Sequence, residues 1–339
     1  MLSASFIVAC SLLMQSPAAP EAAPVPTEPV PPPVMEPVEA PVVELVHPGQ
    51  APLHELRYQP RIDVKQTVSM TTISRSQLVV GGQRSPESST PTQRVMFELS
   101  MEKPGSSPEA AEGRILAAAR VTKVEVIDEH RSMPGTVAML REQLRPLERA
   151  EGRLVFSNDG LLQASGFSLP QETTSQVQAN FAEFQYWLNQ FAVPLPREAV
   201  GVGASWRVKT RPVVSGVQLE QTVTYELLSL DADAVRLKAK VEQSAGPQLV
   251  KLVGAPDDVI CELISQSATG EAEIDLNLAR LAASLSVTSL RSETTSRITS
   301  GGVDHEVTSH NQIELRIRSV DADPPPAIAP EPAAPQPTN

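Results

Sequence analysis

Apolar and polar residues alternate along several segments between residues 57 and 321, as they do in strands that bury one face. The alternating segments are 62–70, 95–101, 219–227, 235–241 and 313–317. This period of two predicts an antiparallel sheet with one face in water. We therefore expect an α+β fold that is predominantly antiparallel β, a curved sheet or half-barrel with two inserted helices.

Two short polar segments predict the turns between these strands. Asn158-Asp159-Gly160 separates two apolar runs and has the composition of a hairpin turn. Asp231 to Asp233 lies between the third and fourth apolar sets and suits a second hairpin. The strands on both sides of each turn are therefore expected to be paired.

Two segments change from period two to helical spacing. Residues 134–150 carry apolar residues three and four apart, although Pro146 should end or kink this helix. Residues 174–193 follow N-cap candidates at Thr173 to Ser175 and stop before Pro194. The second segment has an apolar stripe formed by Val177, Phe181, Phe184, Leu188 and Phe191.

The aromatic residues of the second helix are the candidate ligand-binding residues. Phe181, Phe184, Trp187 and Phe191 would form the floor of an apolar groove beneath a curved sheet. The alternative is that the helix buries this stripe against the sheet as ordinary core. The sequence leaves both interpretations open.

The first 18 residues resemble a secretory signal peptide. Leu2 to Met14 is an apolar run too short to span a bilayer, and Ser16-Pro17-Ala18 offers a cleavage site. No Lys or Arg precedes the run. Ile7-Val8-Ala9-Cys10 also resembles the lipobox of bacterial lipoproteins, which would make Cys10 a lipidation site. Cleavage and acylation are both open.

Proline is concentrated near the two ends of the chain, which has 32 in all. Residues 19–56 alternate Pro, Val, Ala and Glu, and Pro disfavours both helix and sheet ladder, so this segment is expected to be an extended acidic tether. Residues 322–339 repeat the composition and predict a disordered tail. The remaining 57–321 would be a single β-rich domain.

Charge and motifs exclude several functions. The net charge of −12 argues against nucleic-acid binding, and there is no basic amphipathic face for an anionic membrane. Gly201 to Trp206 breaks the dinucleotide fingerprint and is interpreted as a turn leading into a strand. Cys261 lacks a nearby activating group and is interpreted as a buried apolar residue. No catalytic residue, metal site or cofactor is expected.

Two polar features leave alternatives open. His305 and His310 are five apart in a strand region, which points them to opposite faces and disfavours a shared metal. The Ser/Thr-rich run from Ser284 to Ser300 is either a polar ligand face or plain strand surface.

Two motifs carry a loose resemblance to known proteins. Leu195-Pro196 followed by Val200 to Trp206, and later Gly270 to Leu276, are similar to segments of uncharacterised bacterial envelope proteins. In those proteins a Gly-rich turn is followed by a strand that Trp opens, and the second segment opens a final meander. The order of elements also resembles lipoprotein-carrier half-barrels, which implies a sheet that wraps helices and holds an acyl chain.

These observations predict an exported, non-enzymatic envelope protein, located in the periplasm, at the outer membrane or outside the cell. It would bind an apolar ligand or an envelope partner protein. The alternatives are a structural or assembly protein without a ligand, and a hydrolase with an unfamiliar site.

Overall fold

The computed structural model of the chain describes residues 33–62, 64–103, 113–128, 135–169, 191–214, 216–251, 256 and 259–321. Strands make up most of these residues. The strands are β1 (Glu36–Pro37), β2 (Val42–His47), β3 (Gln66–Val80), β4 (Gln83–Arg84), β5 (Ser88–Ser89), β6 (Thr92–Met101), β7 (Arg114–Ile127), β8 (Glu151–Ser157), β9 (Leu162–Ser168), β10 (Ser205–Thr210), β11 (Val213–Val214), β12 (Val217–Gln218), β13 (Glu220–Asp231), β14 (Ala234–Ala245), β15 (Gln248–Val250), β16 (Ile260–Asn277), β17 (Leu285–Ser300) and β18 (Val303–Ser319).

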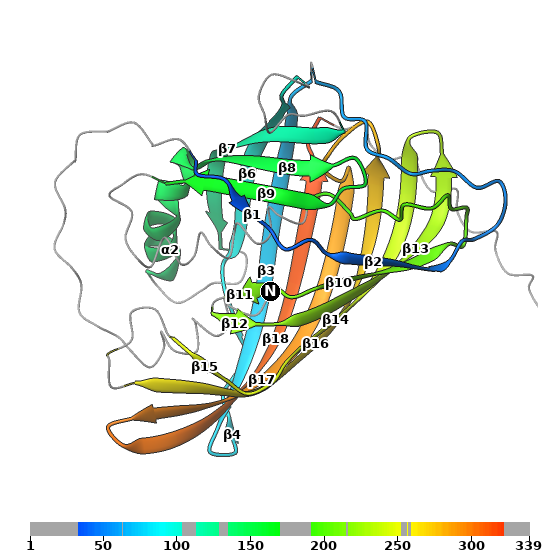
Figure 1. Cartoon of the computed structure of the whole chain (residues 1–339). Coiled ribbons are helices and arrows are strands. Elements are labelled where there is room, and N and C mark those ends of the chain that lie inside the picture. Colours follow the sequence, from blue (N-terminus) through cyan, green and yellow to red (C-terminus); the bar gives the residue numbers. More distant parts are fainter. Residues whose placement is uncertain are drawn as a thin grey trace, which may run out of the picture.

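One large antiparallel sheet contains nearly all of the strands. Its path runs β1-β9-β8-β7-β6-β3-β18-β17-β16-β14-β13-β10-β2, and β4, β5 and β15 add short pairings at its sides. The long strands β3, β18, β17, β16, β14 and β13 lie side by side and curve around the interior of the molecule (Figure 1). The predicted curved, predominantly antiparallel sheet is confirmed, and so are the hairpins β8–β9 and β13–β14.

Helical structure in the described ranges consists of α2 (Thr136–Leu144) and the 3-10 turn η2 (Arg145–Arg149). Pro146 lies at the start of η2, where its missing N–H and fixed φ end the α-helix. The first predicted helix is therefore confirmed, with the predicted break. Residues 174–190 of the second predicted helix lie outside the described residues. Phe191 and Ala192 form a bend, so the prediction of helix up to residue 193 is wrong at that end.

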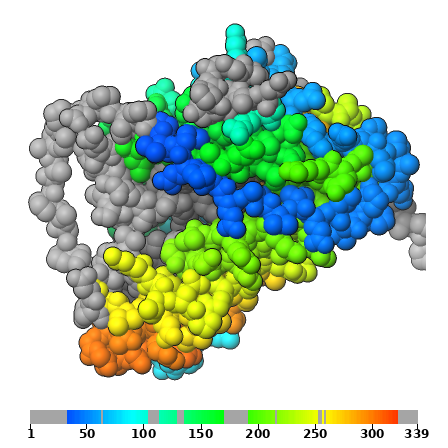
Figure 2. Space-filling model, viewed as in Figure 1, coloured from blue at the N-terminus to red at the C-terminus, as the bar shows by residue number. Residues whose placement is uncertain are grey.

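Residues 33–47 run along both edges of the sheet, and we call them the strap. β1 pairs with β9 at one edge, and β2 pairs with β10 at the other. The four residues Val38–Pro41 connect the two pairings, and the backbone N–H of Val38 donates to the carbonyl of Gln163 at 3.0 Å. The strap, in dark blue, crosses the front of the molecule in Figure 1 and lies on its surface in Figure 2.

In the described residues 33–56, the strap corrects part of the prediction of an extended tether for residues 19–56. A ladder does form at Val42–His47, the Pro-free stretch between Pro41 and Pro48. An edge strand needs hydrogen bonds on one side only, so flanking prolines do not prevent the pairing. Half-buried Val43 and Leu45 pack against the core, opposite Val208 and Trp206 of β10.

Three segments without strands fill one end of the curved sheet, and we call them the plug: 50–61, 191–204 and 278–283. Backbone hydrogen bonds connect them, from His54 to Val200 and from Gln59 to Leu278. The plug contributes fully buried side chains to the main core, among them Leu56, Phe191, Leu195 and Leu281. The plug therefore packs against the concave face of the sheet and forms part of the main core.

The predicted Gly-rich turn lies at the end of plug segment 191–204, and the predicted Trp lies at the start of the next strand. Trp206 opens β10 after the turn at Val202 and Gly203, is fully buried, and donates its Nε1–H to the carbonyl of Pro194 at 2.9 Å. Gly201 lies so close to the backbone of Gln50 that a Cβ would meet its carbonyl oxygen at 1.8 Å. Only glycine allows this crossing of two chain segments. Gly270 to Leu276 lies inside β16.

Candidate functional site

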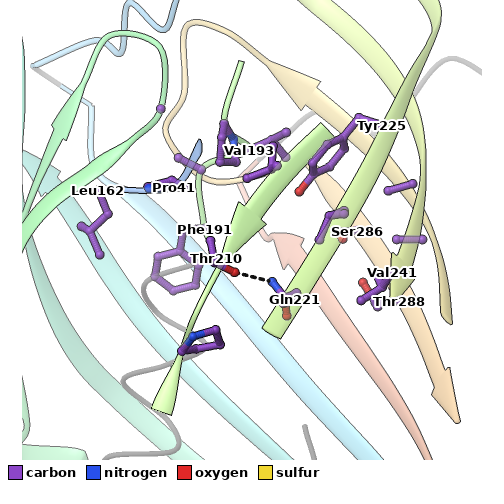
Figure 3. A pocket seen from close by; sticks show the side chains of 18 of the residues that line it. Pro41, Leu162, Phe191, Val193, Thr210, Gln221, Tyr225, Val241, Ser286 and Thr288 are labelled. Atoms are coloured by element: carbon purple, nitrogen blue, oxygen red, sulfur yellow. Dashed lines mark hydrogen bonds between the residues drawn. The ribbon is translucent and has the colours of Figure 1, made fainter. Parts of the chain in front are cut away.

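A cavity of about 460 Å³ lies between the concave face of the sheet, the plug and the strap. The sheet contributes inward-facing residues of β10, β13, β14, β16, β17 and β18. The plug contributes Phe191 to Pro194, and the strap contributes Val38, Glu39 and Pro41. Figure 3 shows Phe191, Val193, Leu162 and Pro41 on one side of the space and Tyr225, Val241, Ser286 and Thr288 on the other. The volume is within the usual range for small-molecule sites.

Small side chains in the middle of the sheet create this space. The strand register places Tyr225, Ala239, Ala272 and Thr288 side by side across β13, β14, β16 and β17. Trp206 and Leu315 continue the row at its two ends. Alanine at two adjacent positions leaves the volume that a Leu or Ile pair would occupy in a filled core. The cavity therefore follows from the sequence of two neighbouring strands.

The cavity changes from apolar to polar along the strands. Gln221 and Gln243 line it one strand apart, and the amide of Gln243 donates to the side-chain oxygen of Gln221 at 2.6 Å. Gln221 in turn donates to Thr210 at 3.3 Å, as the dashed line in Figure 3 shows. Both glutamines are buried. One end of the cavity therefore offers amide and hydroxyl groups.

The polar end continues across the sheet as a strip of buried, uncharged side chains, which we call the polar lane. Gln243 is followed in register by Ala268, Ser292, Asn311 and Ser76. Further inward-facing polar residues lie beside this row. The polar lane consists of Ser74, Ser76, Gln221, Gln243, Gln266, Ser292, Thr294, Ser296, Ser309 and Asn311, each of them less than 9% exposed.

Charged groups are confined to the edge of the cavity. Among the described residues that line it, Glu39 and Arg211 carry charge, both are exposed, and their signs are opposite. The interior therefore presents no net charge to a ligand. A charged ligand buried inside would lack a partner of opposite sign, which is costly in a low-dielectric site.

Tyr58 is a second buried polar group, and in contrast to the polar lane it is fully paired. Its hydroxyl accepts from the backbone N–H of Val193 at 2.9 Å and donates to the carbonyl of the same residue at 3.2 Å. Burial raises the pKa of Tyr58 well above its ordinary value. The neutral phenol fixes plug segment 50–61 to segment 191–204, beside the cavity wall.

One of the four predicted ligand-binding residues lies at the site. Phe191 lines the cavity, is fully buried, and stacks on Phe97 of β6 with ring centroids 4.5 Å apart. Phe181, Phe184 and Trp187 lie outside the described residues, as does Cys10. Cys261 is buried with Val250 and Leu263 in a separate small cluster, as its interpretation as an apolar residue expects.

Sequence reasoning missed Gln221 and Gln243. Both face the buried side of strands whose other buried residues are apolar. Gln221 alternates with Leu219, Val223 and Tyr225, and Gln243 follows Val241 by two residues. A polar residue in the buried phase of an alternating strand was the signal available. The Ser/Thr-rich run has the same property, because Ser286, Ser292, Thr294 and Ser296 of β17 face inward and are buried.

The described ranges show neither a metal site nor a membrane-spanning helix. They contain no group of three or more His, Cys, Asp or Glu side chains placed to hold a metal ion. No helix in the described part of the chain is both long and apolar enough to cross a membrane. His310 lies 3.4 Å from Glu293 on the outer side of the sheet, away from the cavity.

No protein-family model matches the chain, and no curated protein matches it. Among solved structures, the chain is similar to a loop-deletion mutant of OmpT, an outer membrane protein of Vibrio cholerae, at 5% identity and a TM-score of 0.20, over 75% of this chain and 100% of that one. It is also similar to a mutant of the Rh. blastica porin, at 9% identity and a TM-score of 0.20, over 74% of this chain and 100% of that one. TM-scores this low carry no argument about fold or function.

Proposed function

We propose that this chain is a non-enzymatic, exported protein of the cell envelope that binds an apolar ligand, of the kind that a lipid acyl chain provides, in the cavity beneath the curved sheet. The single observation that carries the proposal is the cavity of about 460 Å³ with its mainly apolar lining. The apolar run from Leu2 to Met14 and the Pro-rich stretch after it support export.

The cavity wall suits a flexible apolar chain. Beside the row of Tyr225, Ala239, Ala272 and Thr288, the wall has a second, aliphatic row. This row consists of Val208, Val223, Val241 and Leu290, and Phe191 of the plug lies opposite. Transfer of apolar ligand surface from water into such a lining is favourable by roughly 25 cal/mol per Å². Rigid strands bear most of these residues, so little ordering of the protein would oppose binding.

The test is calorimetric titration of the purified protein with laurate, below the concentration at which laurate forms micelles. We expect saturable binding with a negative heat-capacity change, the mark of buried apolar surface. Native mass spectrometry of protein from cells should also show a co-purified lipid. Saturable binding that buries no apolar surface, or no binding either of laurate or of an uncharged lipid with the same chain, would contradict the proposal.

Filling the cavity gives a sharper version of the same test. Ala239→Leu and Ala272→Leu place larger side chains into the space between β14 and β16, and together they should weaken laurate binding by about tenfold or more. Ala234→Leu is the matched control, because Ala234 is exposed on the same strand. Equal affinities in the filled variant and the control would place the ligand elsewhere.

The envelope location has its own measurement. The mass of the mature N-terminus would distinguish cleavage after Ala18 from acylation at Cys10, and cell fractionation would place the protein. A cytoplasmic protein with an intact Met1 would refute this part of the proposal.

A further inference from the structure

The polar lane contains buried hydrogen-bonding atoms that have no partner in the described part of the chain. These atoms are the side-chain oxygens of Gln243, Ser296 and Asn311 and the amide nitrogen of Gln266. The exposed fractions of the four residues are 6%, 2%, 3% and 4%. Buried polar groups in folded proteins are paired in the great majority of cases, so a cluster of unpaired atoms indicates a partner that comes from outside the chain.

The chemistry of these atoms describes that partner. The side-chain oxygens of Gln243 and Asn311 are acceptors and need a ligand O–H or N–H. The amide nitrogen of Gln266 is a donor and needs a ligand oxygen, whereas the Ser296 hydroxyl can serve in either role. A ligand head with hydroxyl and carbonyl groups can pair with either kind. The four atoms lie on four neighbouring strands, and Gln243 is the one that lines the cavity.

Because the polar lane carries no charged side chain, it favours a ligand head without charge. All ten side chains of the polar lane are uncharged, and the charged lining residues of the cavity, Glu39 and Arg211, lie exposed at its edge. A carboxylate would face the acceptor oxygens of Gln243 and Asn311 without a cation beside them. A neutral head avoids this unfavourable pairing.

The polar lane and the apolar cavity meet at Gln221 and Gln243, which line both. A ligand that occupied both would have an apolar chain joined to a neutral polar head. We infer that the ligand is a neutral amphipathic lipid whose head carries hydroxyl and ester groups, as in a monoacylglycerol, with its chain in the cavity and its head on the polar lane. This inference rests on the proposed function and specifies the ligand class of the same site.

The experiment compares 1-monolauroylglycerol with laurate, which have the same chain and differ in the head. We expect the neutral lipid to bind roughly tenfold more tightly, by calorimetry below the micellar range. Gln243→Met and Asn311→Leu keep similar side-chain volumes and remove the hydrogen-bonding oxygens. Each should reduce the preference for the neutral lipid over laurate severalfold. Gln312→Met, exposed on β18 beside Asn311, is the matched control.

The outcomes separate this inference from the proposed function. Equal affinity for the two compounds, or a preference that Gln243→Met and Asn311→Leu leave intact, would overturn the neutral-head inference while the apolar site stands. Tighter binding of laurate would also overturn it and would move the head toward Arg211 at the edge. Failure of both compounds to bind would overturn the proposed function and this inference with it.

Discussion

Two parts of the sheet's inner face are equally buried and chemically opposite. Ala239 and Gln243 lie four residues apart on β14, about 13 Å along the strand, and are 2% and 6% exposed. Ala239 lies between Tyr225 and Ala272 in register, whereas Gln243 lies between the amide of Gln221 and Ala268 and hydrogen-bonds to Gln221. A buried position is therefore not always part of the hydrophobic core. Near the plug, buried polar groups have hydrogen-bond partners within the chain. The polar lane contains buried atoms that have no partner among the described residues.

The largest expected effect comes from breaking the plug end. Trp206→Ala removes a fully buried indole that stacks on Tyr225 at 5.5 Å and donates to Pro194. Loss of a buried aromatic of this size costs roughly 3–5 kcal/mol of unfolding free energy. Urea denaturation would measure the change. A loss under about 1 kcal/mol would show that the plug does not stabilise the sheet.

Tyr58→Phe tests the buried polar groups that are paired. It leaves the N–H and the carbonyl of Val193 without their partner, at a cost of about 1–3 kcal/mol for each unpaired group. The contribution also depends on pH. Because the folded-state pKa of Tyr58 is raised, its stabilisation is complete below the unfolded pKa of about 10 and is lost as pH rises above it.

The measurement for Tyr58 is the unfolding free energy of wild type and Tyr58→Phe at several pH values from neutral to strongly alkaline. The difference between the two proteins should be largest at neutral pH and shrink above pH ~10. A constant difference throughout would mean that Tyr58 ionises equally easily in the folded and unfolded chain.

Gly166→Val tests the strap, which links the two sides of the site. A Cβ at Gly166 would lie 2.3 Å from the carbonyl oxygen of Val34, so a side chain here must displace the strap from β9. Overpacking of this kind costs about 1–3 kcal/mol. Hydrogen exchange should increase in the strap and in β9. Gly246→Val is the control, since a Cβ at Gly246 meets no atom within 4 Å. Unchanged exchange in the strap would contradict the close approach.

The smallest effect is expected in the polar lane. Gln266→Met removes an amide whose nitrogen has no partner in the described residues and keeps the side-chain length. Unfolding free energy should change by less than about 1 kcal/mol or increase, because no buried group is left unpaired. Thermal denaturation of the ligand-free protein would measure this. A loss comparable to that of Trp206→Ala would show that the polar lane is structural.

Local pattern predicted much of this fold, because alternation, turn residues and Pro146 act within a few neighbours. It predicted the β13–β14 hairpin and the break after α2. It did not predict the strap, since Glu36 pairs with Ser165 and Val43 with Val208, and such distant partners leave no trace in local composition.

The candidate site was predicted only in part. Phe191 was identified as a ligand-facing aromatic, although it lies in a bend and not in a helix as predicted. The β17 part of the polar lane was only one of two alternatives for Ser284 to Ser300, because β17 is polar on both faces. Ser292 and Thr294 face inward while Arg291 and Glu293 face outward, and period two alone cannot say which set is buried when neither is apolar.

The strap also imposes an order on assembly. It is synthesised before every other described segment, yet its partners β9 and β10 begin at Leu162 and Ser205. A chain that emerges from its N-terminus must therefore carry the strap unpaired until both edges exist, and loop closure over such separations is slow. The first described residues to leave the ribosome are thus among the last to be paired, and both edges of the sheet stay available for pairing with other chains until then.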